Sequence, residues 1–313
     1  MSLISEALHD NAAWASAAPR LSVLTPFFRD DPRPLLAALE GEAGGLDGAA
    51  EVVLLDDGGG DDALTAALRS QIKGMSTPVR LVQLSRNAGR AIGRNRLTAH
   101  ARAGHLLFLD SDMLPDSPRF LSAYLALIAR DDPPVVVGGF SVERTARTPA
   151  GALHRAMSAS ADCLTAVERS RAPEKHVFTS NLLVRRDVFE AEAFDEGFSG
   201  WGWEDVEWGM RVAARYGVSH VDNTATHLGL DSAPVLAGKY EQSAANFARL
   251  LARHPETVAR YPSYRAARAL KRTPGRRMWR PWLKSIALAD AAPMRARVAA
   301  MKLYRAALYA EVV

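Results

Sequence analysis

The stretch His105–Leu114, HLLFLDSDML, joins an apolar run to two carboxylates that follow it directly. A short apolar run bounded by turn-forming residues is typical of a strand buried inside a sheet. Asp110 and Asp112 would then lie at the exposed end of that strand, and side chains two positions apart in extended backbone share a face. The stretch therefore predicts a buried strand that ends in a pair of acids.

The same pattern repeats on both sides of this stretch. Short β-branched runs alternate with amphipathic segments from Leu21 to about Gly139, which predicts an α/β domain with a mostly parallel sheet. The expected strands are 21–27, 51–57, 79–85, 105–110 and 135–140, and the expected helices are 34–42, 61–73, 90–103 and 117–130. Later in the chain we expect a helix over 151–170, strands over 177–184 and 218–222, and helices from Pro234 onward.

Composition narrows the class of protein. The 313-residue chain is long enough for one large domain or two, and its lone Cys163 suits a reducing cytoplasm. No stretch approaches the roughly 18 consecutive apolar residues of a spanning helix, and the first twenty residues do not resemble a secretion signal. Residues 260–313 carry 13 Lys/Arg against 2 Asp/Glu, so a basic tail follows an acidic globule. We expect an extension over 1–20, a catalytic domain over 21–230 with halves at 21–115 and 116–230, and a helical basic region over 231–313.

Polar groups follow several of the predicted strands. Ligands bind outside the carboxyl ends of the strands in such sheets, so this edge is the predicted site. The groups are Thr25-Pro26-Phe27, Asp56-Asp57-Gly58, the segment from Asn87 through Arg94, and Asp110-Ser111-Asp112.

Each acidic group has more than one interpretation. The neighbouring carboxylates of Asp110 and Asp112 would repel each other unless a cation lay beside them, and Mg²⁺ or Mn²⁺ prefers such oxygen ligands. Alternatively, Asp112 would cap a turn before Pro115. Asp61 is predicted to cap the helix after the glycine run. Asp56 and Asp57 would suit neutral donors such as a base N–H or ribose hydroxyls, because no G-x-G-x-x-G or Walker lysine motif is present.

The stretch Phe198–Arg211, FSGWGWEDVEWGMR, predicts a glycine-hinged aromatic loop that leads into a helix at Glu204. Glu207 and Arg211 are predicted to form an i,i+4 pair on the solvent side of that helix. The tryptophans of the loop would serve either core packing or a wall for sugar rings, and the flanking glycines favour the wall.

Together these motifs resemble a family 2 glycosyltransferase of the GT-A fold. The resemblance rests on T-P-F, D-D-G, N-A-G-R-A-I-G-R-N, D-S-D (a DXD motif) and G-W-G-W-E-D in this order, over about Leu21 to Leu228. The last motif resembles the branch that transfers galactose and N-acetylgalactosamine. The first motif continues as Phe27-Phe28-Arg29 in place of the usual tyrosine and asparagine, and the Q-x-x-R-W segment of processive synthases is absent.

The resemblance implies a role for each matching residue. Donor and nucleotide contacts would come from Thr25, Pro26, Phe27, Asp57, Arg94, Asp110 and Ser111. Acceptor or sugar contacts would come from Gly200, Trp201, Gly202, Trp203 and Glu204. The metal, Mn²⁺ or Mg²⁺, would be held by Asp112 and His227, and Asp205 would be the catalytic base.

The expected function is metal-dependent, inverting transfer of a hexose or N-acetylhexosamine from a UDP-sugar to a hydroxyl of a glycan or lipid-linked acceptor, in envelope polysaccharide or glycolipid synthesis. Asp205 would take the acceptor proton while positive charge stabilises the departing diphosphate. A nucleotidyltransferase of similar fold is an alternative, although TPFFRDDPR (25–33) has neither glycine nor lysine. A non-catalytic nucleotide-sugar-binding or scaffold subunit is another.

The basic tail interleaves Lys/Arg with Trp279, Trp282, Tyr304 and Tyr309. Basic amphipathic helices with aromatic anchors favour a peripheral position on an anionic membrane, here the inner face. A helical appendage packed on the catalytic domain is the alternative. Nucleic-acid binding is not expected, because no known module is present.

Overall fold

The computed structural model describes residues 4–313, apart from the side chains of Arg276 and Arg277. The first three residues of the expected 1–20 extension lie outside the described residues. The chain divides into two compact units, which we describe separately. The first unit comprises 1–145, 163–196 and 208–229, and the second comprises 146–162, 197–207 and 230–313.

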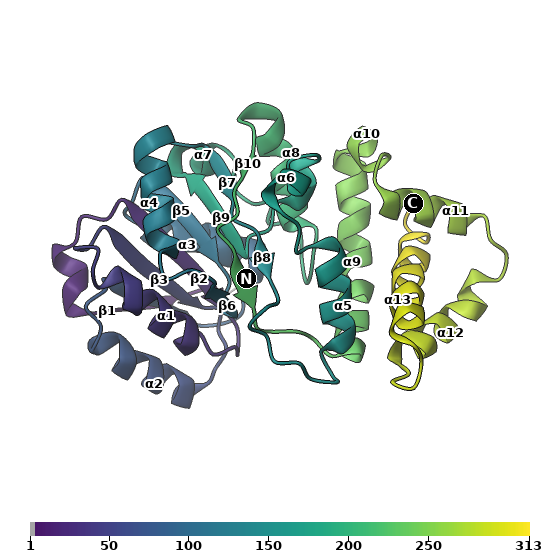
Figure 1. Cartoon of the computed structure of the whole chain (residues 1–313), viewed down its shortest axis with the longest axis horizontal. Helices are drawn as coiled ribbons and strands as arrows, with labels where there is room; N and C mark the ends of the chain where they lie inside the picture. Colours follow the sequence, from purple (N-terminus) through teal and green to yellow (C-terminus); the bar gives the residue numbers. More distant parts are fainter. Residues whose placement is uncertain (1–3) are drawn as a thin grey trace. The chain divides into compact units, whose positions relative to one another are not determined.

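The first unit is built on a central sheet with the strand order β1-β4-β3-β2-β5-β9-β7-β10 (Figure 1). Strands β4, β3, β2 and β5 run parallel to one another, whereas β1 is antiparallel to β4, and β9 is antiparallel to both β5 and β7. The strands are β1 (Glu6–Asp10), β2 (Leu21–Phe27), β3 (Ala50–Asp56), β4 (Val79–Leu84), β5 (His105–Leu109), β7 (Val135–Val137), β9 (Asn181–Arg185) and β10 (Ser219–His220). The predicted α/β fold with a largely parallel sheet is confirmed.

Helices cover both faces of this sheet. The alternation of a strand sends Val52 and Leu54 of β3 into one apolar core, and Val53 and Leu55 into the other. The helices are α1 (Arg33–Ala43), α2 (Asp62–Lys73), α3 (Arg90–His100), α4 (Phe120–Asp131), α6 (Ala166–Arg169), α7 (Arg186–Ala191) and most of α8 (Glu204–Arg215), with short 3₁₀ turns η1 (Ala12–Ser16) and η2 (Pro173–His176). As predicted, the Asp61 side chain caps α2, accepting a hydrogen bond from the Leu64 N–H at 2.9 Å.

A smaller sheet with the order β6-β11-β8 completes the first unit. Its strands are β6 (Met113–Pro115), β8 (Phe140–Ser141) and β11 (Ala225–His227). The expected strand 135–140 ends instead at Val137, because Gly139 has φ +79° and a side chain at Gly138 would overlap Tyr124 and Asn181. The chain therefore leaves the central sheet at the glycine pair and enters the small one.

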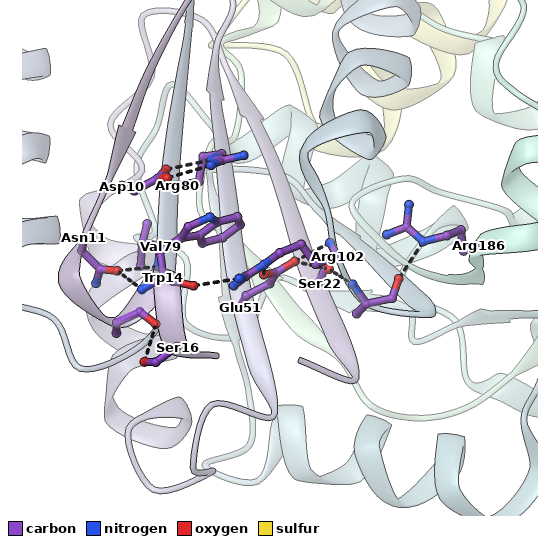
Figure 2. A network of polar contacts seen from close by, with 12 residues as sticks. Asp10, Asn11, Trp14, Ser16, Ser22, Glu51, Val79, Arg80, Arg102 and Arg186 are labelled. Atoms are coloured by element: carbon purple, nitrogen blue, oxygen red, sulfur yellow. Dashed lines mark hydrogen bonds and ion pairs between the residues drawn. The ribbon is translucent and has the colours of Figure 1, made fainter. Parts of the chain in front are cut away.

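Residues 6–16, expected within an extension, form β1 and η1 on the edge of the central sheet. Asn11 donates to the Met75 and Thr77 carbonyls and accepts from the Val79 N–H, as Figure 2 shows in part. The guanidinium of Arg102 lies 3.9 Å from the Trp14 ring centre and donates to the Trp14 carbonyl (Figure 2).

The fully buried Glu51 is the centre of the same network. It accepts from Ser22 Oγ at 2.6 Å and from the Nε and backbone N–H of Arg102, each at 2.7 Å. Because a buried carboxylate without partners is costly, this triple pairing fixes the position of the loop after α3.

The second unit is helical. The expected helix 151–170 is interrupted after Ala161, and the chain returns to the first unit at Cys163, where Thr165 and Glu168 form a capping box that starts α6. Helix α13 packs against both α9 and α12 (Figure 1). The helices are α5 (Ala152–Ala161), the first turn of α8, α9 (Ala233–Arg253), α10 (Pro255–Val258), α11 (Pro262–Lys271), α12 (Arg276–Leu288) and α13 (Met294–Tyr309).

Candidate functional site

The predicted donor residues of the first unit share one edge of the central sheet. Phe27 of β2 is paired with Asp56 of β3, and β2 also pairs with β5, so their carboxyl ends lie side by side. Thr25 is buried and Phe27 belongs to a hydrophobic core, whereas Pro26 is half-exposed. The common edge follows from parallel pairing, which aligns strand ends.

Asp57 holds the loop that follows β4. Its carboxylate accepts from the backbone N–H groups of Ala88 at 2.6 Å and Gly89 at 3.0 Å, and from Asn87 Nδ2 at 2.9 Å. Burial raises the pKa of Asp57, against the lowering effect of these backbone hydrogen bonds. A carboxylate has about four lone-pair sites, so the predicted contact with a base N–H stays a prediction alongside this loop-holding role.

The buried Arg94 forms an ion pair with the partly exposed Asp110. Arg94 Nη2 donates to Asp110 Oδ1 at 2.8 Å, and the arginine side chain is only 2% exposed. Arg94 belongs to α3, and its predicted contact with the base or phosphates of the donor stays a prediction. Ser111, in the turn that follows, is buried.

Asp112 and His227 meet because the small sheet aligns them. Strands β6 and β11 are antiparallel, with His227 opposite Met113, so His227 lies beside the residue that precedes β6. His227 Nε2 lies 3.0 Å from Asp112 Oδ2. Burial raises the pKa of the Asp112 carboxyl, but the hydrogen bond and charge of His227 outweigh it, and the pKa lies below its ordinary value.

Gly229 is required by this arrangement. A Cβ at Gly229 would overlap the carboxylate of Asp112, so only glycine lets the chain pass this close. The backbone N–H of Leu228 also donates to the Asp112 carbonyl at 2.8 Å. The backbone of T-H-L-G (226–229) therefore packs closely against Asp112.

The donor set fits a divalent cation that is shared with a substrate. One carboxylate and one imidazole converge, and cations such as Mg²⁺ commonly use one or two carboxylates and complete their shell with water and substrate phosphates. Within residues 4–313, no group of three or more His, Cys, Asp or Glu side chains is arranged to hold a metal. The structure brings together the two residues that the sequence predicts as metal ligands, and their binding of a metal stays a prediction.

The aromatic loop lies in the second unit and has unusual backbone. Gly200, Gly202 and Trp203 have φ of +71°, +90° and +76°. The left-handed region suits glycine, but for tryptophan it costs on the order of 1–2 kcal/mol. Strain of this kind persists only where surrounding contacts enforce it.

Helix α9 supplies those contacts through Asn246. Its Nδ2 donates to the carbonyls of Ser199 and Gly202, each at 2.9 Å, and more weakly to that of Trp201 at 3.4 Å. The side chain is buried, with 3% of the residue exposed. One amide therefore fixes the path of the loop just before α8.

The two loop tryptophans differ in their surroundings. Trp203 Nε1 donates to the Tyr309 hydroxyl at 3.0 Å, and the indole packs against Phe247. Trp201 contacts the Tyr240 ring edge-on, with centres 5.8 Å apart. Both remain partly exposed, so core packing and a sugar-facing surface coexist, and their predicted sugar contacts stay predictions.

The first turn of α8 carries three acids, where the helix dipole favours negative charge. Glu204 is buried, and Asp205 is half-buried with Oδ1 accepting from the Val206 N–H at 2.8 Å. The predicted solvent-side position of Glu207 is wrong.

Glu207 is completely buried and lies 3.2 Å from His254 Nε2 and 3.3 Å from Arg253 Nε. Arg211 donates to Glu192 at 2.6 Å, where Arg215 also pairs at 3.1 Å. Glu207 is buried because its carboxylate meets basic side chains of the second unit, to which it belongs, whereas Arg211 belongs to the first.

Sequence reasoning missed Asn246, Tyr309 and Gly229. Asn246 and Ser243 are three positions apart on the buried side of α9, and such polar residues within an apolar helix face are the signal that would have identified them. Gly229 had no signal beyond its position two residues after His227.

Comparison with known proteins agrees with this architecture. None of the curated proteins compared with the chain matches it. Residues 22–191, more than half of the chain, match the family described as Glycosyl transferase family 2.

Several solved structures share the fold at low identity. A mannosyltransferase, PcManGT from Pyrobaculum calidifontis, is 15% identical with a TM-score of 0.58, covering 94% of this chain and 88% of its own. Residues 1–349 of TarS from S. aureus are 16% identical with a TM-score of 0.55, covering 94% and 90%. Glucosyl-3-phosphoglycerate synthase from Mycobacterium tuberculosis is 18% identical with a TM-score of 0.50, covering 78% and 82%. With a GT-A-type sheet and a family match over its sheet-forming half, the chain belongs to Glycosyl transferase family 2.

Proposed function

We propose that the protein is a metal-dependent, inverting glycosyltransferase that moves a hexose or N-acetylhexosamine from a UDP-sugar to a hydroxyl of a glycan or lipid-linked acceptor. The observation that carries the proposal is the convergence of Asp112 and His227 after β5 and at the end of β11. Such a pair suits a cation that also binds a diphosphate. Family membership argues against the nucleotidyltransferase alternative.

The nature of the donor is supported by the structural neighbours and the sequence resemblance. TarS has been crystallised with UDP and with UDP-GlcNAc, and PcManGT with GDP-Man and Mn²⁺. The G-W-G-W-E-D loop resembles that of galactose- and N-acetylgalactosamine-transferring enzymes. We therefore propose a UDP-linked hexose or N-acetylhexosamine, with Mn²⁺ or Mg²⁺ as cofactor.

Each proposed role uses chemistry that the residue already shows. Asp112 and His227 would hold the cation, which supplies positive charge to the departing diphosphate. Arg94 keeps Asp110 in place through their ion pair, so Asp110 can accept hydrogen bonds from ribose hydroxyls. Asp57 fixes the loop after β4 beside the nucleotide.

Asp205 is the proposed general base. It is half-buried, and the N–H of Val206 holds one of its oxygens. It would take the proton from the acceptor hydroxyl as that oxygen attacks the anomeric carbon, and a single displacement inverts the centre. Glu204, Gly200, Trp201, Gly202 and Trp203 would shape the surface for the sugar rings.

The test is UDP release by the purified full chain with Mn²⁺, across a panel of UDP-sugars and hydroxyl acceptors. Asp205→Asn should lower kcat by about 10²–10⁴-fold while the dissociation constant for the donor is unchanged. Asp112→Asn should instead weaken Mn²⁺-dependent donor binding. Asp61→Asn is the matched control, because asparagine caps α2 as well as aspartate does.

Three outcomes would contradict the proposal. Failure of every UDP-sugar to bind or turn over would favour a non-catalytic subunit. Full activity in Asp205→Asn would remove the assigned base. Donor binding and turnover unaffected by EDTA would remove the metal.

A further inference from the structure

Helix α12 presents a row of large apolar side chains that the rest of the second unit leaves uncovered. Met278, Trp282 and Ile286 are 80%, 74% and 42% exposed. They are four positions apart, so they lie on one face of the helix, one turn above another. We call these three residues the α12 stripe.

The opposite face of α12 is firmly docked. Ala287 is buried, and the backbone carbonyl of Ala287 accepts from Arg297 Nε of α13 at 3.1 Å. Arg280 pairs with Glu311 at 2.6 Å, and Lys284 pairs with Glu241 of α9 at 2.7 Å. The helix is therefore held in one orientation against α13 (Figure 1), and that orientation exposes the stripe.

The remaining aromatic residues of the tail behave differently from the sequence expectation. Tyr304 and Tyr309 are buried, because α13 packs against both α9 and α12. They are not surface anchors. Of the aromatic rings predicted to be anchors, Trp282 is the one whose exposure fits that role.

The C-terminal segment that contains the stripe is strongly basic. Residues 260–313 contain 13 Lys/Arg and 2 Asp/Glu. Arg265, Arg268 and Arg272, on α11 and directly after it, are exposed. Both acids of the region, Asp290 and Glu311, are already engaged by Arg297 and Arg280. An apolar row within a segment of excess positive charge complements a surface that has an apolar interior beneath an anionic outer layer.

We propose that the α12 stripe inserts into the headgroup region of an anionic lipid bilayer, with α12 lying in the plane of the membrane. Thirteen residues at 1.5 Å per residue make α12 about 20 Å long, and tryptophan is favoured at the boundary between headgroups and acyl chains. Among the described helices, none has the length and apolar character of a membrane-crossing segment. The proposal rests on the second unit alone and not on the catalytic assignment.

The test compares flotation of the full chain with vesicles of phosphatidylcholine alone and vesicles containing 30% phosphatidylglycerol. The variant M278S/W282S/I286S should bind the anionic vesicles at least about tenfold more weakly than wild type, because the apolar area that enters the bilayer is lost. The double variant R268Q/R272Q should lose about fivefold per charge, since each basic residue near an anionic surface contributes about 1 kcal/mol. The control V235S changes an exposed apolar residue of α9 and should bind as wild type does.

A second measurement does not depend on the fold of the triple variant. In a C163S background, a fluorophore attached to the cysteine of the W282C variant should shift its emission to the blue when anionic vesicles are added. The same fluorophore attached to the V167C variant should not. Equal binding by wild type and the triple variant, or equal binding to both kinds of vesicle, would overturn the proposal. The proposal would also be overturned if wild type failed to bind vesicles and light scattering showed a wild-type dimer that the triple variant did not form. The stripe would then join two copies of the chain.

Discussion

Replacement of Asn246 by alanine should release the aromatic loop. The amide nitrogen donates two good hydrogen bonds, at 2.9 Å each to the carbonyls of Ser199 and Gly202, and a longer one at 3.4 Å to that of Trp201; the amide oxygen accepts a long one, at 3.4 Å, from the Ser199 N–H. A neutral hydrogen bond contributes about 0.5–1.5 kcal/mol, and a buried carbonyl left without a partner costs about 1–3 kcal/mol. We therefore expect Asn246→Ala to lower the free energy of unfolding of the second unit by about 2–3 kcal/mol.

Urea unfolding followed by tryptophan fluorescence measures this change, because Trp201 and Trp203 lie in the loop itself. The loop should also become sensitive to limited proteolysis, since the positive φ of Trp203 is no longer enforced. Asn246→Asp keeps the shape but turns carboxylate oxygens toward the loop carbonyls, so it should destabilise at least as much. Val235→Ala, at an exposed position on the same helix, is the control.

The reasoning fails if Asn246→Ala changes the unfolding free energy by less than about 0.5 kcal/mol and the loop stays resistant to protease. The left-handed backbone would then be held by other contacts. A loss of transferase activity without loss of stability would also contradict the argument, because it would give Asn246 a direct catalytic role.

Two further perturbations follow from the first unit. Gly229→Ala should weaken Mn²⁺-dependent donor binding, measured by calorimetry, by at least about tenfold, because the new Cβ displaces the Asp112 carboxylate. Gly238→Ala is the control, since the space around Gly238 is open and donor binding should not change. Equal donor binding by the two variants would refute the assignment of Asp112. Glu192→Gln should lower the free energy of unfolding by about 1 kcal/mol at pH 7, because it removes the carboxylate charge that pairs with two arginines. Burial raises the pKa of Glu192, but the two arginines outweigh it and hold the pKa below its ordinary value. The contribution of the pair is therefore complete above pH ~4.3 and lost as the pH falls through the lower folded pKa; a cost that persists at pH 2 in urea titrations would contradict this origin.

The sequence predicted those parts of the fold that depend on local pattern. The apolar runs at Leu21–Phe27 and His105–Leu109 form the expected strands, and Asp61 caps its helix because a cap needs only a neighbour three residues away. The alignment of the donor residues follows instead from the pairing of the strands. Parallel strands place their ends together, so the order of the motifs along the chain indicated a common edge.

What escaped prediction depends on distant partners. Strand β1 (Glu6–Asp10) has no apolar alternation, and its position depends on Asn11 reaching the Met75 and Thr77 carbonyls. Glu207 and Arg211 have the spacing of a surface pair on one helix, but Glu207 is buried beside His254 in the second unit, and Arg211 pairs with Glu192 in the first. A pattern within one helix cannot show that the helix passes from one compact unit to another at Trp208.

The C-terminal helices are more than a basic appendage, because they enforce the backbone of the loop that precedes Glu204 and Asp205. Tyr309 of α13 accepts the indole hydrogen of Trp203 and lies 2.8 Å from Ser243 Oγ of α9, so both helices meet at the strained residue. The same α13 supports α12, whose stripe we assign to the membrane. A single packed helix thus links the conformation of the loop to the surface that would meet lipid. The direct consequence is that truncation before α13 should remove membrane binding and the loop conformation together, whereas loss of the α12 stripe alone should remove only the first.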